Sequence, residues 1–239
     1  QRSGVENESD IYAARITPDG RLLDIGGIPV CTVLHEQIYP DVASDGHDFL
    51  VVWEDTRGAF SGGTDADVYG ARITADGRVL DPNGFAISRA PTRQANPTVG
   101  WNGASYLAAW HDSRLSPAAG AVFDIYGARI SPAGTVLDPS GIPICTATNL
   151  QWWPKVAAWN GDFFVAWVDL RHFPDAPDAI YGTRVTGAGS VVHPDGFLLT
   201  EHEPSDYPSL AANATGYLMA WGVLRCGGVV CSDAVAVRM

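Results

Sequence analysis

Three aspartates recur at one place in the sequence and are the first candidates for chemistry. Asp55, Asp112 and Asp169 each follow an apolar run that ends in tryptophan, and an arginine stands two residues after each. A ring of carboxylates would suit acid–base or metal chemistry, but a residue present in every copy of a repeat more often supports the fold. We therefore predict structural ion pairs of Asp55 with Arg72, Asp112 with Arg129 and Asp169 with Arg184, or of the same aspartates with Arg57, Arg114 and Arg171.

Glycoside hydrolysis is the enzyme chemistry that the acidic residues would suit, because it needs only two carboxylates roughly 5–10 Å apart. Glu36, Glu201 and Glu203 lie in loops where such a pair could form. No acidic pair departs from the repeat, however, and no Gly-x-Ser-x-Gly, phosphate loop or dinucleotide fingerprint is present. We predict no catalytic residue and no enzyme activity, with a glycosidase-like hydrolase as the alternative.

Two acidic segments suggest a metal. Asp65-Ala-Asp67 and Asp45-Gly-His-Asp48 resemble parts of a calcium loop, but neither completes the Asp-x-Asp-x-Asp-Gly spacing. The histidines show no His-x-x-x-His or Cys/His pairing and are expected at the surface: His35, His47, His111, His172, His193 and His202. We predict no metal and no cofactor, with calcium as the alternative.

The cysteines divide into two kinds. Cys226 and Cys231 bracket Gly-Gly-Val-Val between two expected antiparallel strands, where a disulfide is geometrically reasonable. Such a bond would imply an oxidising, exported location. Cys31 and Cys145 follow the same Ile-Pro motif in different copies of the repeat, so we expect them to be far apart and to be buried free thiols.

The candidate residues belong to a unit that recurs along the whole chain. One element reads Asp-Ile-Tyr-Gly-Ala-Arg-Ile, with small variations, and a second is the apolar run that ends in Trp-x-Asp-x-Arg, where Val223 replaces the aspartate of the fourth copy. The others are Leu-Asp-Pro-x-Gly-Ile-Pro-Ile and an aromatic-Pro-x-Val-Ala run. Each is a short β-branched or aromatic run between turn residues, which predicts a strand. The arginine of the first element recurs as Arg15, Arg72, Arg129, Arg184 and Arg238.

Each repeat is predicted to be a four-stranded antiparallel meander. Asn102-Gly103 and Asn160-Gly161 supply the positive φ that a two-residue hairpin requires, and Asp19-Gly20 and Asp76-Gly77 do the same at a later hairpin. The run that ends in tryptophan is continuously apolar, as expected of a strand buried on both faces. Four-stranded units of this length, repeated around an axis, are β-propeller blades. We therefore predict an all-β fold, a β-propeller of four-stranded antiparallel blades.

The chain resembles a propeller-like group of bacterial secreted or surface proteins with tandem Trp-x-Asp-x-Arg and Asp-Ile-Tyr-Gly-x-Arg repeats. The resemblance covers nearly the whole chain, because four copies keep their internal spacing. It implies the fold and an exported bacterial protein, and it carries no ligand or activity.

The repeat divides one predicted domain, residues 1–239, into copies. The expected boundaries are 1–39 (partial), 40–96, 97–153, 154–207 and 208–239 (partial). The sequence opens and closes within a blade and holds one strand more than a closed ring of four such blades. We expect about four blades, in a closed ring whose last blade takes strands from both ends, or in part of a larger ring. An unpaired terminal strand would allow self-association or belong to a larger parent chain.

One face of the predicted ring carries the loops that vary between copies, and variable loops on a rigid scaffold commonly form binding sites. The same face carries the residue before the proline of each first strand: Tyr39, Asn96, Trp153 and Tyr207, with Trp152 beside Trp153. If the first strands line the channel, these residues ring its mouth and suit stacking against a sugar or a peptide. We predict them as ligand-binding residues, with packing between blades as the alternative.

The charge of the chain excludes some partners. It has 27 Asp and Glu against 15 Lys and Arg, a net charge of -12, which removes the counterion release that drives nucleic-acid binding and disfavours anionic membranes. No apolar run reaches the roughly 20 residues that span a bilayer. We predict a non-enzymatic, lectin-like binding or scaffold module that recognises a glycan or a protein, located in the secreted, periplasmic or cell-surface fraction. A structural part of a larger secreted protein is a further alternative.

Overall fold

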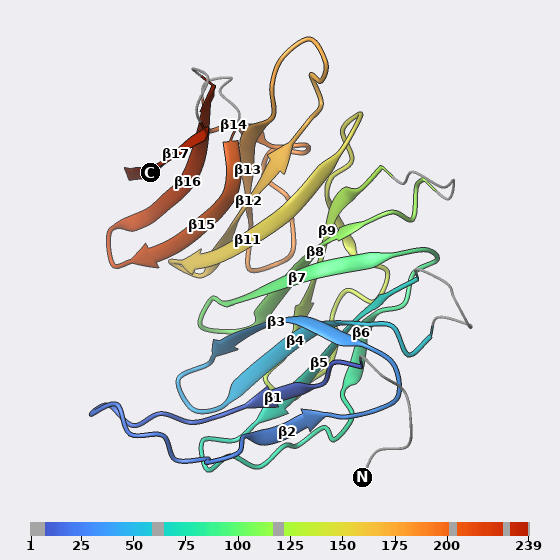
Figure 1. The fold of residues 1–239 in the computed structure, drawn as a ribbon, viewed down its shortest axis with the longest axis vertical. Helices are drawn as coiled ribbons and strands as arrows, with labels where there is room; N and C mark the ends of the chain where they lie inside the picture. The colour runs from blue at the N-terminus through green and yellow to red at the C-terminus, as the bar shows by residue number, and fades with distance from the viewer. Residues whose placement is uncertain (1–7, 59–64, 117–121, 201–204, 227–229, 239) are drawn as a thin grey trace.

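The computed structural model describes residues 8–58, 65–116, 122–200, 205–226 and 230–238, and within these it describes the backbone alone for 205–206, 224–226 and 230–238. The described residues form seventeen strands and no helix (Figure 1). None of this part of the chain therefore forms a helix long and apolar enough to cross a membrane. The predicted all-β class is confirmed.

The strands form five antiparallel sheets that follow one another along the chain. The first has two strands, β1 (Ile11–Ala13) and β2 (Ile28–Cys31). Three meanders of four strands follow: β3 (Gln37–Ser44), β4 (Phe49–Asp55), β5 (Asp67–Ile73) and β6 (Phe85–Ser88); β7 (Gln94–Trp101), β8 (Tyr106–Asp112), β9 (Asp124–Ile130) and β10 (Ile142–Cys145); and β11 (Gln151–Trp159), β12 (Asp162–Asp169), β13 (Ala179–Val185) and β14 (Phe197–Leu198). The last sheet has β15 (Ser205–Asn213), β16 (Gly216–Cys226) and β17 (Val230–Arg238).

The Asn-Gly turns connect the first and second strands of the meanders. Asn160 and Gly161 both have positive φ, 53° and 85°, and form a two-residue turn between the paired residues Trp159 and Asp162. At Asn102-Gly103 the last pair is instead Trp101 with Tyr106, so this turn is longer than predicted. The Asn102 side chain caps it by accepting the backbone N–H groups of the two residues after Gly103.

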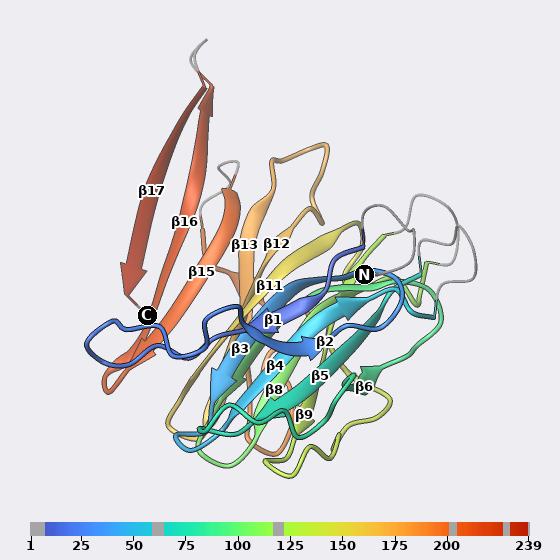
Figure 2. The same ribbon diagram turned by 60° about the horizontal axis from the view of Figure 1, so that its bottom comes forward.

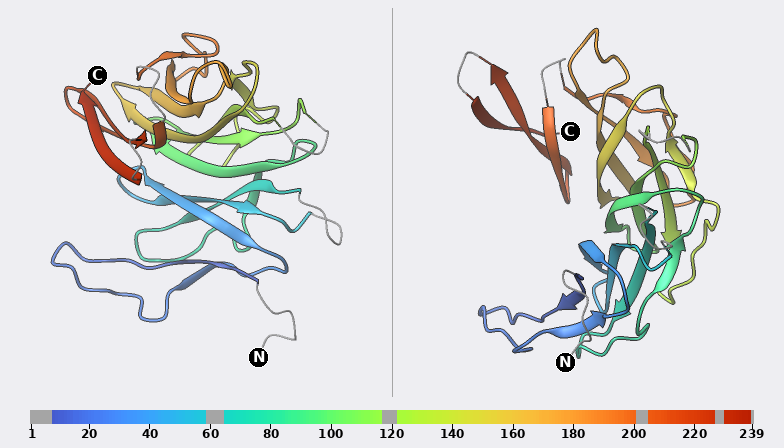
Figure 3. Two further views of the ribbon diagram at one scale, coloured as in Figure 1. Left: turned by 45° about the horizontal axis from the view of Figure 1, so that its top comes forward. Right: turned by 45° about the vertical axis from the view of Figure 1, so that its right-hand side comes forward.

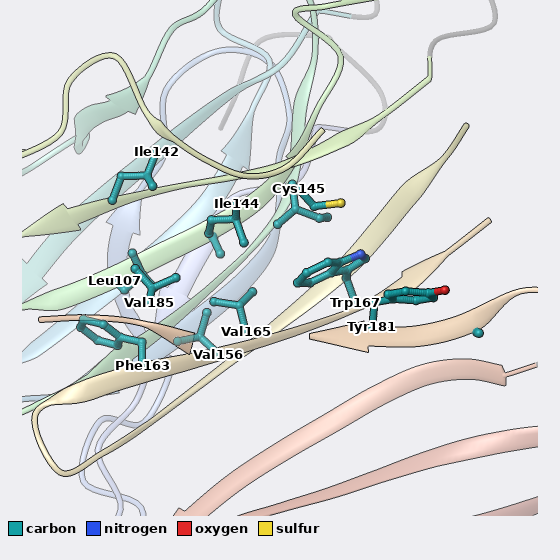
Figure 4. Packing of buried hydrophobic residues seen from close by; sticks show 13 residues of the cluster. Leu107, Ile142, Ile144, Cys145, Val156, Phe163, Val165, Trp167, Tyr181 and Val185 are labelled. Carbon is teal, nitrogen blue, oxygen red and sulfur yellow. The ribbon is translucent and has the colours of Figure 1, made fainter. Parts of the chain in front are cut away.

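The second strand of each meander is buried on both faces, as its apolar sequence predicts. Trp53, Trp110 and Trp167 are fully enclosed, and every residue of β8 is buried. Leu107 of β8 and Phe163 of β12 belong to one apolar cluster, so the core lies between successive sheets (Figure 4). This arrangement follows from the general need of a sheet to cover its apolar faces with another layer.

The sheets follow one another in an arc, with β1–β2 at one end and β15–β17 at the other (Figure 3). The β15–β17 sheet stands at one edge of the molecule in Figure 2. The first strands β3, β7, β11 and β15 contact one another in turn and form the inner side of the arc. The closed ring in which the first two strands complete the last blade is not formed, because β1–β2 and β15–β17 are separate sheets and β17 takes the place beside β16.

Each complete meander contains an ion pair within its Trp-x-Asp-x-Arg motif. Asp55 accepts the indole N–H of Trp53 at 2.8 Å and pairs with Arg57 at 2.6 Å. The Arg57 guanidinium lies 4.0 Å from the ring centroid of Tyr69 on the neighbouring strand. The other two meanders repeat these contacts with Trp110, Asp112, Arg114 and Tyr126, and with Trp167, Asp169, Arg171 and Tyr181.

The predicted pairing of Asp55 with Arg72 is therefore wrong. Arg72 lies opposite Leu50, at the other end of β4 from Asp55, and pairs with Asp81 at 2.8 Å. The same holds in the other meanders, where Arg129 pairs with Asp138 and Arg184 pairs with Asp162. The arginine that follows the aspartate by two residues is the partner because the two side chains lie at the same end of the strand.

Two cysteines are free thiols. Cys31 and Cys145 are buried and unpaired, and burial raises the pKa of both thiols, that of Cys145 to about 12. The side chains of Cys226 and Cys231 lie outside the described part of the structure. Their backbones belong to β16 and β17, where Cys226 is paired with Val230 and Cys231 with Arg225. The proposed disulfide therefore stays a prediction.

Candidate functional site

Each first strand begins with the same distortion of the backbone. The strand register shifts across the residue–proline pair in β3, β7, β11 and β15. The residue before each proline has a positive φ: Tyr39 52°, Asn96 49°, Trp153 51° and Tyr207 45°. This conformation is costly for residues other than glycine, and bulges of this kind redirect side chains next to functional sites. Its recurrence in four sheets marks this end of the strands as a candidate site.

A buried glutamine holds the start of the first strand in each complete meander. In β3 the side-chain amide of Gln37 donates to the carbonyl of His35 at 2.8 Å, which ties the strand to the loop before it. The equivalent donors and acceptors are Gln94 with Thr92 at 2.9 Å, and Gln151 with Asn149 at 3.4 Å. The bulged residues are thus mounted on a fixed strand end rather than on a free loop.

A pocket of about 470 Å³ opens where the four first strands meet. We call it the mouth pocket. The rings of Trp153 and Tyr207 both belong to its lining and pack face to face, with centroids 4.4 Å apart and an angle of 30° between planes. The predicted ring of side chains from four separate sheets therefore surrounds one opening. Its lining consists of Tyr39, Pro40, Asp41, Asn96, Pro97, Trp153, Pro154, Lys155, Tyr207 and Pro208.

Trp152 occupies a different position from the other predicted binding residues. It does not belong to the lining of the mouth pocket. Its ring stacks behind Trp153 at 4.5 Å and 24°, and it packs against the apolar cluster between the third meander and the last sheet. Trp152 thus supports the stacked pair of Trp153 and Tyr207 from behind.

Asp41 is the acidic residue in the lining of the mouth pocket. Its Oδ2 atom accepts the hydroxyl of Thr98 at 2.8 Å and the backbone N–H of Val99 at 3.0 Å, both from β7. Its Oδ1 atom accepts the N–H of Val42 at 2.9 Å. These donors fix the carboxylate between two first strands. Lys155, on β11, contributes a positive charge to the same lining.

A buried polar cluster lies behind Asn96. Glu54 is almost fully buried, pairs with Arg93 at 2.8 Å and accepts the backbone N–H of Asn96 at 3.2 Å. The Nε2 atom of His111 lies 3.4 Å from the Asn96 side-chain nitrogen, and its ring packs against Phe123 at an angle of 50° between planes. Burial, with a smaller effect of Arg93, lowers the pKa of His111 to about 3, so the imidazole is neutral. The predicted surface location is wrong for His111, because its strand is buried on both faces.

Sequence reasoning missed the charged residues of this region because it concentrated on positions that recur. Asp41 and Lys155 occupy equivalent places, directly after the proline of the bulge. Glu54 and His111 occupy the variable position of Trp-x-Asp-x-Arg, which is Val168 in the third meander. A position that varies inside an otherwise constant motif is not required by the scaffold. That variation was the available signal.

The other acidic residues considered for chemistry lie elsewhere. Glu36 is exposed and does not line the mouth pocket, and Glu201 and Glu203 fall outside the described residues. In the calcium-like segment, an Asp45 oxygen accepts the backbone N–H groups of His47 and Asp48, as in an ordinary turn. Within the described ranges, no three His, Cys, Asp or Glu side chains are grouped as a metal site requires.

The fold and the mouth pocket define an all-β, propeller-like protein with a pocket at the inner strands. No family model matches the chain, and no curated protein matches its sequence. Among solved structures, an endo-arabinase from Bacteroides thetaiotaomicron matches 98% of this chain and 87% of its own, with a TM-score of 0.54 and 12% identity. A GH43_1 enzyme from Xanthomonas citri complexed with xylose matches 83% and 73%, with a TM-score of 0.52 and 14% identity. An α-L-arabinofuranosidase from Lactobacillus brevis matches 89% and 77%, with a TM-score of 0.51 and 11% identity.

These matches correct two predictions. The chain was expected to be a non-enzymatic binding or scaffold module and not an enzyme, and both expectations are contradicted because the similar structures are glycoside hydrolases. The glycosidase-like alternative fits them better. At these low identities, the likeness establishes the propeller-like fold of the chain and not its reaction.

Proposed function

We propose that the chain is a glycosidase-like hydrolase whose substrate binds in the mouth pocket. The observation that carries this proposal is the combination of a stacked aromatic pair, Trp153 and Tyr207, with the oriented carboxylate of Asp41 in one lining. The likeness of the fold to glycoside hydrolases supports the same conclusion.

The pocket has the size and the surface that a sugar requires. Its volume of about 470 Å³ lies within the roughly 300–1,000 Å³ of typical small-molecule sites. One face of a sugar ring is apolar and stacks on aromatic rings, while its hydroxyl groups need polar partners at the edge. Trp152 and Tyr207 cover the two faces of Trp153, so the ring on offer is the outer face of Tyr207. Asn96, Asp41 and Lys155 offer the polar groups.

Hydrolysis of a glycosidic bond requires a pair of carboxyl groups. Asp41 is our candidate for one of them, because it belongs to the lining and three donors orient it. Asp41 is the acidic residue in the described lining of the mouth pocket, so the second carboxyl group is not assigned to a residue. Glu54 is less suitable, since it is buried and already paired with Arg93.

The substrates to test first follow from the similar structures, which include an arabinase, an arabinofuranosidase and an enzyme complexed with xylose. We infer that arabinose- or xylose-containing oligosaccharides are the substrate class. We also propose a secreted, periplasmic or cell-surface location, where such oligosaccharides are released from polysaccharides.

The test is an assay of the purified full chain with arabino- and xylo-oligosaccharides and with nitrophenyl arabinofuranoside and xyloside. We expect hydrolysis that falls by about a hundredfold or more in Asp41→Asn. Asp175→Asn is the matched control, because Asp175 is exposed on the loop after β12. The proposal fails if the parent chain hydrolyses none of these substrates, or if Asp41→Asn keeps the activity of the control.

A further inference from the structure

The two-stranded sheet β1–β2 occupies the position of an incomplete preceding blade. The backbone N–H of Gln37 donates to the carbonyl of Ser9, just before β1, at 2.8 Å. Gln94 and Gln151 make the same bond to the residues just before β5 and β9, both at 2.7 Å. Arg15 pairs with Asp24 as Arg72 pairs with Asp81. β1 and β2 are therefore the third and fourth strands of a blade.

β1 lacks the neighbour that every other third strand has. In the complete meanders β5, β9 and β13 each pair with a strand on both sides. Among the described residues, β1 pairs with β2 alone. An unpaired strand edge is a template for another extended chain.

The surfaces that a second strand normally covers are uncovered at this end of the arc. Tyr12 of β1 is 52% exposed. Its counterparts in the complete meanders are each only 7% exposed, because an arginine that follows the second strand lies over each ring: Tyr69, Tyr126 and Tyr181. Ile16 is 67% exposed, and its counterpart Ile73, which is paired with Phe49 of the second strand, is 4% exposed.

Gly27 occupies the position at which the tryptophan of a second strand packs in other sheets. Gly84 and Gly196 follow the third strand, have φ of +73° and +74°, and leave no room for a Cβ because a tryptophan atom would lie 2.5 Å from it. Gly27 holds the same place after β1, with φ of +78°. Its nearest side-chain neighbour is the exposed Tyr12.

Tyr12 and Ile16 line one apolar groove of about 690 Å³, which we call the β1 groove. It runs between the edge of β1 and the uncovered face of the first complete meander. Val42 on that face is 56% exposed, while the equivalent Val99 and Val156 are 6% and 8% exposed. The residues that matter here are Tyr12, Ile16, Leu23, Val42, Phe49 and Ile73.

We propose that the β1 groove binds an extended peptide of Trp-x-Asp-x-Arg sequence, paired antiparallel with the edge of β1 that no described strand covers. Its tryptophan packs over Gly27, as a tryptophan does over the equivalent glycine in the first and third complete meanders. Its arginine stacks on Tyr12, as the arginine does on the equivalent tyrosine in all three. A second copy of this chain is not the source, because its own strands of this sequence, β4, β8 and β12, lie between two paired strands.

The test measures binding of a labelled peptide to the full chain. The peptide copies residues 162–171, which are β12 and the two residues after it, Asp-Phe-Phe-Val-Ala-Trp-Val-Asp-Leu-Arg. Two added lysines give solubility, and a fluorophore allows anisotropy to be measured. We expect saturable binding that weakens about tenfold or more when the peptide tryptophan and arginine are replaced by alanine. In the protein, Tyr12→Ala should weaken binding to a similar degree, and Phe173→Ala, at an equally exposed aromatic outside the groove, should not.

Hydrogen exchange and sedimentation locate the site. Peptide binding should slow amide exchange in residues 11–16 and leave exchange in β17, the edge of the last sheet, unchanged. The proposal is overturned if no binding is measured, if Tyr12→Ala binds as the parent does, or if exchange slows in β17 instead. It is also overturned if the chain alone forms a dimer that Tyr12→Ala abolishes, since the groove would then belong to a second copy.

Discussion

The rings of Trp153 and Tyr207 stack with their centroids 4.4 Å apart, although the two residues begin the first strands of different sheets. Each stands before a proline, with a positive φ, at a shift in the strand register. The stack therefore depends on the same distortion in two copies of the repeat. It joins the third meander to the last sheet at the mouth pocket.

Removing one ring of this pair should weaken binding without unfolding the protein. Tyr207 is 65% exposed, so Tyr207→Ala removes little buried area. An aromatic stacking contact contributes about 0.5–1.5 kcal/mol, and we expect affinity for an oligosaccharide to fall about two- to tenfold. Isothermal titration calorimetry measures it. Phe173→Ala is the matched control, and equal affinity of the two variants would place the sugar elsewhere.

The two kinds of ion pair should differ in their contribution to the free energy of unfolding. Arg171 pairs with Asp169, whose side chain is 0% exposed, and Arg171→Ala leaves that carboxylate buried without its cation. We expect a loss of roughly 3–5 kcal/mol. Arg184→Ala breaks the exposed pair with Asp162 and should cost less than about 1 kcal/mol. Urea unfolding of both variants tests this, and similar losses would contradict the assignment.

Substitution of Gly196 and of Gly161 by alanine should destabilise the protein to different degrees, because only Gly196 is crowded by a neighbouring side chain. Both have positive φ, +74° and +85°. A Cβ on Gly196 would lie 2.5 Å from Trp167, whereas a Cβ on Gly161 meets nothing within 4 Å. Gly161→Ala should cost about 1–2 kcal/mol from its backbone alone, and Gly196→Ala should cost about 1–3 kcal/mol more from overpacking. Thermal unfolding and near-ultraviolet circular dichroism of the tryptophan report both effects. Equal losses would show that Trp167 moves aside freely.

Asp124 should destabilise the protein at neutral pH. Burial raises its pKa to about 6 from an ordinary value of 3.8, with repulsion from Asp112 and Asp195 adding to the shift. The folded state therefore holds the proton more tightly than the unfolded state. The contribution of this group to stability is complete below pH 3.8 and is lost as pH rises through 6.

Asp124→Asn should consequently increase the free energy of unfolding at pH 7 by about 1–3 kcal/mol and have little effect at pH 3.5. Urea unfolding between these pH values measures the difference, with Asp175→Asn as an exposed control. A gain that is independent of pH would assign the effect to something other than titration.

Much of the fold could be predicted from the sequence because the same pattern of apolar runs and turn residues recurs in each copy of the repeat. The apolar run before Trp167 predicted a strand buried on both faces, and Asn160-Gly161 predicted its turn; both are confirmed. The position before the first-strand proline also predicted which side chains meet at the mouth, including Trp153 and Tyr207. These inferences hold because strand burial and turn conformation depend mainly on neighbouring residues.

The partners of individual side chains could not be predicted in the same way. Arg72 and Arg57 follow Asp55 in the same copy, and only the strand register shows that Arg72 lies at the far end of the strand. Asp41 was not recognised because the donors that orient it, on Thr98 and Val99, come from another repeat.

The sequence by itself determined the repeated strands, their turns and the residues that surround the mouth, because periodic polarity and turn chemistry are local properties. Tertiary structure alone decided that His111 is buried and that Tyr12 lies exposed beside an unpaired strand edge. Side-chain burial and strand pairing depend on which segments lie against each other, and these segments are distant along the chain. Copies of nearly the same sequence therefore differ in burial and pairing between the middle of the arc and its ends.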